Sequence, residues 1–281
     1  MPPRVTVIIP TYNWSTVLPY SIGSVLDQTF TDFELLVVGD GCTDDSAQVV
    51  GAIDDPRVRW IDLQPGTGHQ SGPNNEGLRQ ARGELIAYLG HDDLWLPHHL
   101  ASAVAALDGG ADLAHSIIAM IGPDESRAEP HRVPQGRPGW IAPSAVVHRR
   151  SMIDRVGAWG DYRELYVDPE VDLWRRAYDA GLAFTFVPRL TVVKFPASLR
   201  RDVYRERPSH QQEAWLRRIR TDPDLEVVEL AHTVANLNRP SPSIAVRLWR
   251  LVNPSRWLAR ARRRKGARLK AVQRFKGLNR P

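Results

Sequence analysis

The first hundred residues alternate short apolar runs with longer amphipathic segments. The apolar runs are short and rich in β-branched residues, which is typical of strands buried on both faces of a mostly parallel sheet. Between them, apolar residues recur at helical spacing. The expected strands are residues 4–10, 33–38, 58–63 and 84–89, and the expected helices are residues 15–28, 44–53 and 74–82. Strands that alternate with helices predict parallel pairing through right-handed crossovers, and therefore a Rossmann-like layered α/β fold.

The pattern continues less regularly after residue 97. Residues 122–139 are rich in Pro, Gly and charge and predict a loop, and residues 145–147 are expected to pair at a sheet edge. From about residue 200 the sequence becomes helical and heavily charged. The other expected elements are helices at residues 97–108, 150–156 and 169–180 and strands at residues 112–120, 183–187 and 191–195.

Charge divides the chain into an acidic body and a basic end. Residues 241–281 contain thirteen Lys or Arg and no acidic residue, which leaves 24 basic and 32 acidic residues, a net charge of −8, in residues 1–240. We expect a folded α/β domain over residues 1–200, a charged helical segment over residues 201–240, and a basic amphipathic tail over residues 241–281. Such a tail suits an anionic membrane surface, although a solvated helix packed on the domain is an alternative. No nucleic-acid motif accompanies the charge, so no nucleic-acid partner is expected.

Several protein classes are disfavoured by the sequence. Met1 leads directly into a strand-like run, so no signal peptide is expected, and no apolar stretch approaches the roughly 18 residues of a membrane-spanning helix. One cysteine, Cys42, excludes an internal disulfide and a multi-cysteine metal cluster. No G-x-G-x-x-G follows the first strand, which disfavours a dehydrogenase. We expect a cytoplasmic protein, held peripherally at the inner face of the plasma membrane by its tail.

Polar residues gather where three of the expected strands end. The three clusters are residues 11–13, 40–42 and 91–93, and ligands of such sheets bind beyond the carboxyl ends of the strands. Asp92 and Asp93 are adjacent, and two neighbouring carboxylates repel unless a positive charge lies between them. A divalent cation between the two carboxylates would offset this repulsion. The alternative is a solvated turn in which one Asp caps the next helix.

Four segments together resemble the family 2 glycosyltransferases, which have the GT-A fold. They read VIIPTYN with SVLDQTF; FELLVVGDGCTDDS; an Asn-x-Gly helix leading into GHDDLWLP; and SAVVHRRSMIDRVGAWGDY followed by PEVDLWRRA. Their order and spacing match the family over about residues 4–195. The resemblance implies an inverting enzyme that uses a nucleoside-diphosphate sugar and serves cell wall or polysaccharide biosynthesis. It also implies that residues 1–200 are a GT-A glycosyltransferase catalytic domain, which we expect to be followed by a basic helical C-terminal extension.

The chemistry of that reaction explains the residue types. A Mn²⁺ or Mg²⁺ ion bound to the diphosphate stabilises it as a leaving group, and such cations take a few carboxylate oxygens and share the rest of their shell with phosphate and water. The acceptor hydroxyl must lose its proton to a carboxylate. The acceptor is expected to be a glycan or a lipid-linked saccharide, a hypothesis that depends on the tail.

The resemblance assigns a role to individual residues. It implies that Glu170 is the catalytic base and that Asp92 and Asp93 bind the metal. Asp168 and Asp172 compete with Glu170, although Asp172 precedes Arg176 by four residues, as in an ion pair on a helix surface. The residues implied to bind the nucleotide sugar are Pro10, Thr11, Tyr12, Asn13, Asp40, Asn75 and Asp92. For Asp40 the alternative is an Asp-Gly turn that needs no ligand.

Two departures from the family pattern keep other functions open. Gly90 stands where the family has the first Asp of its cluster, and Gly39 stands where it often has a second Asp at the end of the strand. Both favour a rival hypothesis, a non-catalytic nucleotide-sugar-binding or scaffold protein. A second rival is a retaining or nucleotidyl-transferring enzyme, which would not need Glu170.

Overall fold

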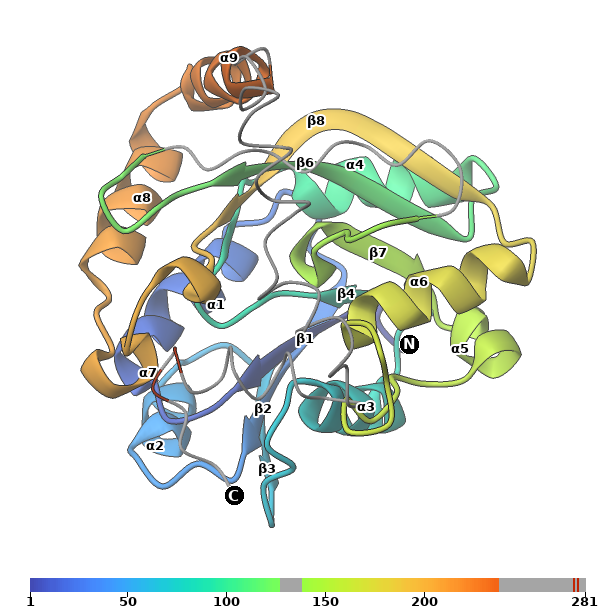
Figure 1. The fold of residues 1–281 in the computed structure, drawn as a ribbon, viewed down its shortest axis with the longest axis horizontal. Helices are drawn as coiled ribbons and strands as arrows, with labels where there is room; N and C mark the ends of the chain where they lie inside the picture. The colour runs from blue at the N-terminus through green and yellow to red at the C-terminus, as the bar shows by residue number, and fades with distance from the viewer. Residues whose placement is uncertain (127–137, 238–274, 276, 278–281) are drawn as a thin grey trace, which may run out of the picture.

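The computed structural model of the protein describes residues 1–126, 138–237, 275 and 277. It contains an eight-stranded sheet with the strand order β3-β2-β1-β4-β7-β6-β8-β5 (Figure 1). The strands are β1 (Val5–Thr11), β2 (Phe33–Asp40), β3 (Val58–Leu63), β4 (Leu85–Tyr88), β5 (Leu94–Trp95), β6 (Leu113–Met120), β7 (Val146–Arg149) and β8 (Phe184–Lys194).

Helices cover both faces of this sheet. The α-helices are α1 (Leu18–Leu26), α2 (Ser46–Gly51), α3 (Ser71–Gln80), α4 (His99–Asp108), α5 (Ser151–Val156), α6 (Pro169–Asp179), α7 (Val203–Glu206), α8 (His210–Thr221) and α9 (Leu225–Leu237). Side chains of α1, α2 and α4 pack on one face of the central strands, and those of α3, α5 and α6 pack on the other. Alternate residues such as Val7 and Ile8 therefore belong to different cores, which explains why β1 is apolar throughout.

The pairing of the strands brings several carboxyl ends to one edge. Strand β1 is parallel to β2 and β4. Strand β7 is antiparallel to both β4 and β6, and β6 is parallel to β8. It follows that β1, β2, β4 and β8 all run in the same direction, so residues that follow these strands lie along the same edge of the sheet.

Most of the predicted elements are confirmed to within a few residues, and two are wrong. Residues 145–147 do not lie at a sheet edge, because β7 is placed between β4 and β6. Residues 183–187 and 191–195 do not form two strands but belong to the single strand β8. The ladder between β6 and β8 shifts register around Ile117, opposite the part of β8 that contains Pro188. Proline has no N–H to donate, and such irregularities accommodate it without ending the strand.

Helix α9 packs on β6 and β8, and α8 packs on α1 and at the same end of the sheet (Figure 1). Trp215 and Leu216 of α8 are buried in one cluster with Phe195 and Leu94. The division at residue 200 stays a prediction, and this packing joins the residues after it to the same folded body. The tail, residues 241–281, lies outside the described residues apart from positions 275 and 277. Among the residues that the structure describes, no helix has the length and apolarity that crossing a membrane requires.

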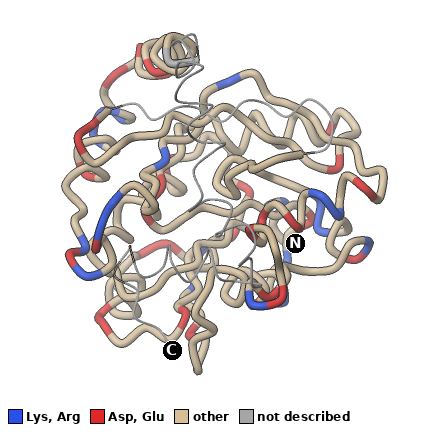
Figure 2. Tube along the Cα trace, viewed as in Figure 1, with Lys and Arg blue, Asp and Glu red and all other residues tan. Residues whose placement is uncertain are grey.

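Acidic and basic positions are interspersed over the described body (Figure 2). Many of them form ion pairs at the surface, such as Arg189 with Glu226 and Arg220 with Asp27. Exposed pairs of this kind contribute little to stability. Charge therefore becomes informative where it is buried, as it is around Asp93.

Candidate active site

The residues predicted to form the site gather at the carboxyl edge of the sheet. Thr11 ends β1, Asp40 ends β2, and the turn of residues 91–93 follows β4. Lys194, the last residue of β8, reaches the same edge from the other half of the sheet. Two segments distant in sequence therefore supply charged groups to one place.

Asp93 is fully buried and accepts hydrogen bonds from three donors. Its Oδ2 atom accepts from the Lys194 ammonium at 2.7 Å and from the Ser144 hydroxyl. Its Oδ1 atom accepts from the backbone N–H of Phe195 at 3.1 Å. The ammonium of Lys194 thus offsets the repulsion expected between the adjacent aspartates. The expectation that Asp93 binds a metal stays a prediction, and these contacts favour a structural role.

Lys194 interacts with three carboxylates at once. Burial by itself would lower the pKa of the Lys194 ammonium, but Asp93, Asp92 and Glu170 together outweigh burial and raise that pKa. The ammonium is therefore charged at neutral pH. Arg200 also interacts with Asp92 and Asp93, although burial dominates and lowers the pKa of its guanidinium. The carboxylates of this edge lie among fixed positive charges.

Asp92 has the chemistry expected of a metal ligand, and the structure allows that role. Its side chain is largely buried, and its backbone carbonyl accepts from Gln212 of α8 at 3.2 Å. A Cβ atom at Gly90 would lie 2.9 Å from Oδ2 of Asp93 and 3.3 Å from Oδ1 of Asp92. Little space is therefore left for the carboxylate that the family has at this position, the first of its cluster. Within the described residues no three His, Cys, Asp or Glu side chains form a metal-binding group. A cation bound here would be held by one carboxylate, with phosphate and water completing its coordination shell, as is common for Mg²⁺.

Glu170 lies in the first turn of α6 and is largely buried. Burial raises the pKa of its carboxyl group, and the nearby Asp168 raises it further, while the hydrogen bonds to its own backbone N–H and to Trp140 and the charge of Lys194 act in the opposite direction. A buried carboxylate with a raised pKa is a stronger base than an exposed one. Asp172 is paired with Arg176 at 2.8 Å, which confirms the expected ion pair on the helix.

The carboxylate of Asp40 holds the loop that follows β3. Its Oδ1 atom accepts from the backbone N–H and the hydroxyl of Thr67, at 2.6 and 2.9 Å, and its Oδ2 atom accepts from the N–H of Gly68 at 3.0 Å. A Cβ atom at Gly39 would lie 2.4 Å from the ring of Trp60. The indole ring thus occupies the place of the side chain that the family often has there.

Three other predicted binding residues make structural contacts. Asn13 has a left-handed φ of 44°, and its side-chain oxygen accepts from the N–H of Thr43 at 2.6 Å, which fixes the turn after β2. The side chain of Asn75 exchanges two hydrogen bonds of 2.9 Å with the backbone of Trp159. The hydroxyl of Thr11 lies 2.9 Å from Nδ1 of His91. Their roles in nucleotide binding stay predictions.

Pro10 and Tyr12 lie at the same end of β1 and are both half-buried. The side chains that connect the site, Lys194, Ser144, Trp140 and Gln70, were not predicted from the sequence. The only signal for Lys194 is a single charge at the end of the apolar run TVVK. The others follow no motif, because their partners lie far away in the chain.

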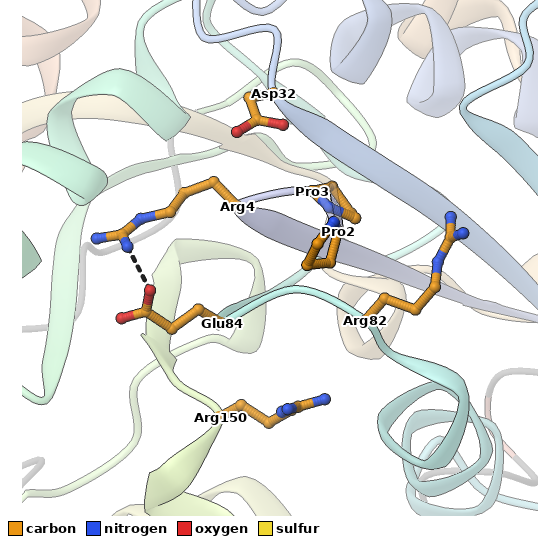
Figure 3. Close-up of a pocket in the computed structure, with 7 residues that line it drawn as sticks. All are labelled: Pro2, Pro3, Arg4, Asp32, Arg82, Glu84 and Arg150. Carbon is orange, nitrogen blue, oxygen red and sulfur yellow. Dashed lines mark hydrogen bonds and ion pairs between the residues drawn. The ribbon is translucent and has the colours of Figure 1, made fainter.

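A hollow of about 340 Å³ lies at the opposite edge of the sheet, where β1 and β4 begin (Figure 3). Two of its three arginines pair with acidic residues, Arg4 with Glu84 and Asp108 and Arg82 with Glu34. The third, Arg150, donates to the carbonyl of Ala81. It is lined by Pro2, Pro3, Arg4, Asp32, Arg82, Glu84 and Arg150. This hollow is remote from Asp92 and Glu170 and is not part of the candidate active site.

The α/β fold and the carboxylates at its edge define the class of the protein. Residues 6–160 match the family model described as glycosyl transferase family 2, which is more than half of the chain, and the chain therefore belongs to that family. The sheet and its flanking helices are those of GT-A glycosyltransferases.

Individual relatives are similar over parts of their length. The GalNAc(5)-diNAcBac-PP-undecaprenol beta-1,3-glucosyltransferase of Campylobacter jejuni is 34% identical over 113 residues, which are 38% of this chain and 36% of that protein. The crystal structure of S. aureus TarS 1–349 with UDP-GlcNAc is 20% identical with a TM-score of 0.59, covering 84% of this chain and 72% of that one. The mannosyltransferase PcManGT from Pyrobaculum calidifontis, in complex with GDP-Man and Mn²⁺, is 18% identical with a TM-score of 0.57, covering 100% and 89%. The sequence match thus spans little more than a third of the curated Campylobacter relative.

Proposed function

We propose that the protein is an inverting glycosyltransferase that moves a sugar from a nucleoside diphosphate to a hydroxyl group of a glycan or lipid-linked saccharide. The observation that supports this proposal is that Lys194 interacts with Asp93, Asp92 and Glu170 together. The candidate metal ligand and the candidate base are therefore both near enough to this ammonium group to raise its pKa. Membership of the family supports the reaction class, and the name of the Campylobacter relative supports a lipid-linked acceptor in polysaccharide biosynthesis.

In the proposed reaction, Glu170 accepts the proton of the acceptor hydroxyl as that oxygen bonds to the anomeric carbon and the bond from this carbon to the diphosphate oxygen breaks. Burial and the raised pKa of Glu170 suit this role. Asp92 would hold a Mn²⁺ or Mg²⁺ ion, which as a Lewis acid would stabilise the diphosphate leaving group. Lys194 keeps Asp93 in place beside Asp92.

Titration calorimetry with UDP, GDP and dTDP, with and without Mn²⁺, tests the donor side of the proposal. We expect one nucleotide to bind more tightly with the metal, and the gain to disappear in Asp92→Asn. Equal affinities with and without metal for every nucleotide would contradict the metal role.

A non-catalytic nucleotide-sugar-binding protein is the second candidate, favoured by the missing carboxylates at Gly39 and Gly90. It predicts nucleotide binding without sugar transfer. Transfer of a radiolabelled sugar from the bound donor to lipid extracts, abolished by Glu170→Gln, would exclude it.

We also propose that the tail binds an anionic membrane surface. A chain in which Arg262, Arg263, Arg264 and Lys265 are changed to Gln should sediment less with vesicles that contain phosphatidylglycerol. Unchanged sedimentation would contradict this part of the proposal.

A further inference from the structure

We infer that Gln70 and Trp140 are positioning residues that hold the carboxylate of Glu170, and that the loop containing Gln70 links this carboxylate to Asp40. The inference rests on the proposed function, in which Glu170 is the base. It concerns residues that lie outside the family motifs of this chain.

Each carboxylate oxygen of Glu170 accepts a hydrogen bond from a different segment. The indole Nε1–H of Trp140 donates to Oε1 at 2.9 Å, and the amide of Gln70 donates to Oε2 at 3.3 Å. Gln70 immediately precedes α3, whereas Trp140 precedes β7. A glutamate side chain has several rotatable bonds, so two donors from independent segments fix the plane of its carboxylate far better than one.

The two hydrogen-bond donors to Glu170 are neutral. The charged groups that shift its pKa belong to other segments. Asp168, just before α6, opposes ionisation, whereas Lys194 at the end of β8 favours it. Neither Gln70 nor Trp140 carries a charge, so each lowers the pKa of the carboxylate only as a neutral donor does, while the two together fix its orientation. This is the arrangement expected around a general base.

The loop between β3 and α3 is fixed at both of its sides. On one side, Asp40 binds the N–H groups of Thr67 and Gly68. On the other, the guanidinium of Arg163 donates to the carbonyl of Thr67 at 3.0 Å. Gln70 follows Gly68 by two residues, so a displacement of the loop at Asp40 also moves the amide that binds Glu170. The loop thereby joins the nucleotide side of the candidate site to its base.

The first test measures the carboxyl pKa of Glu170 directly. ¹³C NMR of protein labelled at the glutamate carboxyl carbon, assigned with Glu170→Gln, follows the titration of this group without any substrate. We expect the pKa to rise in Gln70→Met and in Trp140→Phe, because each loses a donor to the charged form. Gln80→Met is the matched control. The amide of Gln80, at the other end of α3, donates to Glu76, so its loss should leave the pKa of Glu170 unchanged.

The second test is the pH profile of kcat. The acid limb of the profile should move to higher pH in Gln70→Met and Trp140→Phe. In both variants kcat at neutral pH should fall by about 10- to 100-fold. The nucleotide affinity of Trp140→Phe should stay within twofold of wild type. Asp40→Asn should shift the limb in the same direction. Asp44→Asn, which removes a carboxylate bound to the N–H and hydroxyl of Ser46 at the start of α2, should not. A wild-type titration and profile in both donor variants would overturn the inference. If the pKa of Glu170 moves as expected but Glu170→Gln transfers sugar at the wild-type rate, the positioning stands and the proposed base is wrong.

Discussion

The ammonium nitrogen of Lys194 lies 2.7 Å from Oδ2 of Asp93, a side chain with no exposed surface. Lys194 ends β8 and Asp93 follows β4, so this ion pair joins the two halves of the sheet at the edge that contains the candidate site. Asp92 and Asp93 are adjacent in sequence but are placed in different surroundings. We therefore expect substitutions at the two positions to have different effects.

Lys194→Met should destabilise the fold strongly. Removing one partner of a buried pair leaves a buried charge uncompensated, which typically costs about 3 to 5 kcal/mol. Urea denaturation followed by tryptophan fluorescence measures the loss. Lys194→Arg, which keeps the charge, is the control and should lose much less stability. Equal midpoints for Lys194→Met and wild type would show that the pair contributes nothing to the fold.

Asp92→Asn and Asp93→Asn should separate binding from stability. Because the proposed cation contacts Asp92, Asp92→Asn should remove the metal-dependent gain in nucleotide affinity with little change in the free energy of unfolding. Asp93→Asn should lower the free energy of unfolding, since the Lys194 ammonium then loses its charged partner. Calorimetric titration and urea denaturation on the same preparations check both. The reverse pattern would make Asp93 the metal ligand.

Much of the fold could be predicted from the sequence, because each central strand is a short apolar run bounded by turn residues. The apolar runs of β1, β2 and β4 show no alternation, and the structure buries both of their faces. The position of β7 could not be predicted, since four residues with an apolar start fit an edge strand as well as an interior one. The single strand β8 was missed because Pro188 interrupts its pattern.

The candidate site was predictable only where its residues belong to motifs. Asp92 and Glu170 are found from the order of the motifs along the chain. Lys194, Gln70 and Trp140 are not, because each acts through a partner about 30 to 100 residues away. Pairing between distant segments is set by the packing of the whole sheet and leaves no local pattern.

Glu170→Gln should lower kcat by about 100-fold or more, because the proposed base can no longer accept a proton. In the wild type, activity should fall as the pH drops through the raised pKa of Glu170, hence at a higher pH than for an ordinary glutamate.

The raised pKa of Glu170 also affects stability. Because the folded state binds this proton more tightly than the unfolded chain, stability is lost as the pH rises through the pKa of the folded state. Glu170→Gln should therefore be more stable than wild type at neutral pH. Initial rates and thermal unfolding from pH 5 to 8 test both statements.

Buried histidines should make the fold sensitive to mild acid. Burial lowers the pKa of His99 to about 3 and the pKa values of His115 and His148 to about 4, from 6.5. The unfolded chain therefore binds more protons than the folded one below pH 6.5, and stability is lost as the pH falls from 6.5 towards 4. Each histidine contributes up to about 1.4 kcal/mol per pH unit.

Urea midpoints at pH 7, 6 and 5 measure this loss. His115→Phe, next to the ring of Phe186 at 5.4 Å, should reduce the dependence on pH by removing one of the three groups. An unchanged slope in this variant would show that His115 is not held neutral.

Trp215→Ala should reveal whether residues 201–240 fold with the sheet. Trp215 of α8 is buried, and its ring centroid lies 6.4 Å from that of Phe195. The guanidinium carbon of Arg218 lies over the indole ring, 4.5 Å from its centroid. Truncation of a buried tryptophan costs about 3 to 5 kcal/mol. If α8 belongs to the same cooperative unit as β8, the whole unfolding transition should move to lower urea, as seen by circular dichroism and by fluorescence alike. Exposed Val227, on α9, provides the control, and Val227→Ala should leave the midpoint nearly unchanged. A separate early transition in Trp215→Ala, with the main transition unmoved, would instead support an independent helical segment after residue 200.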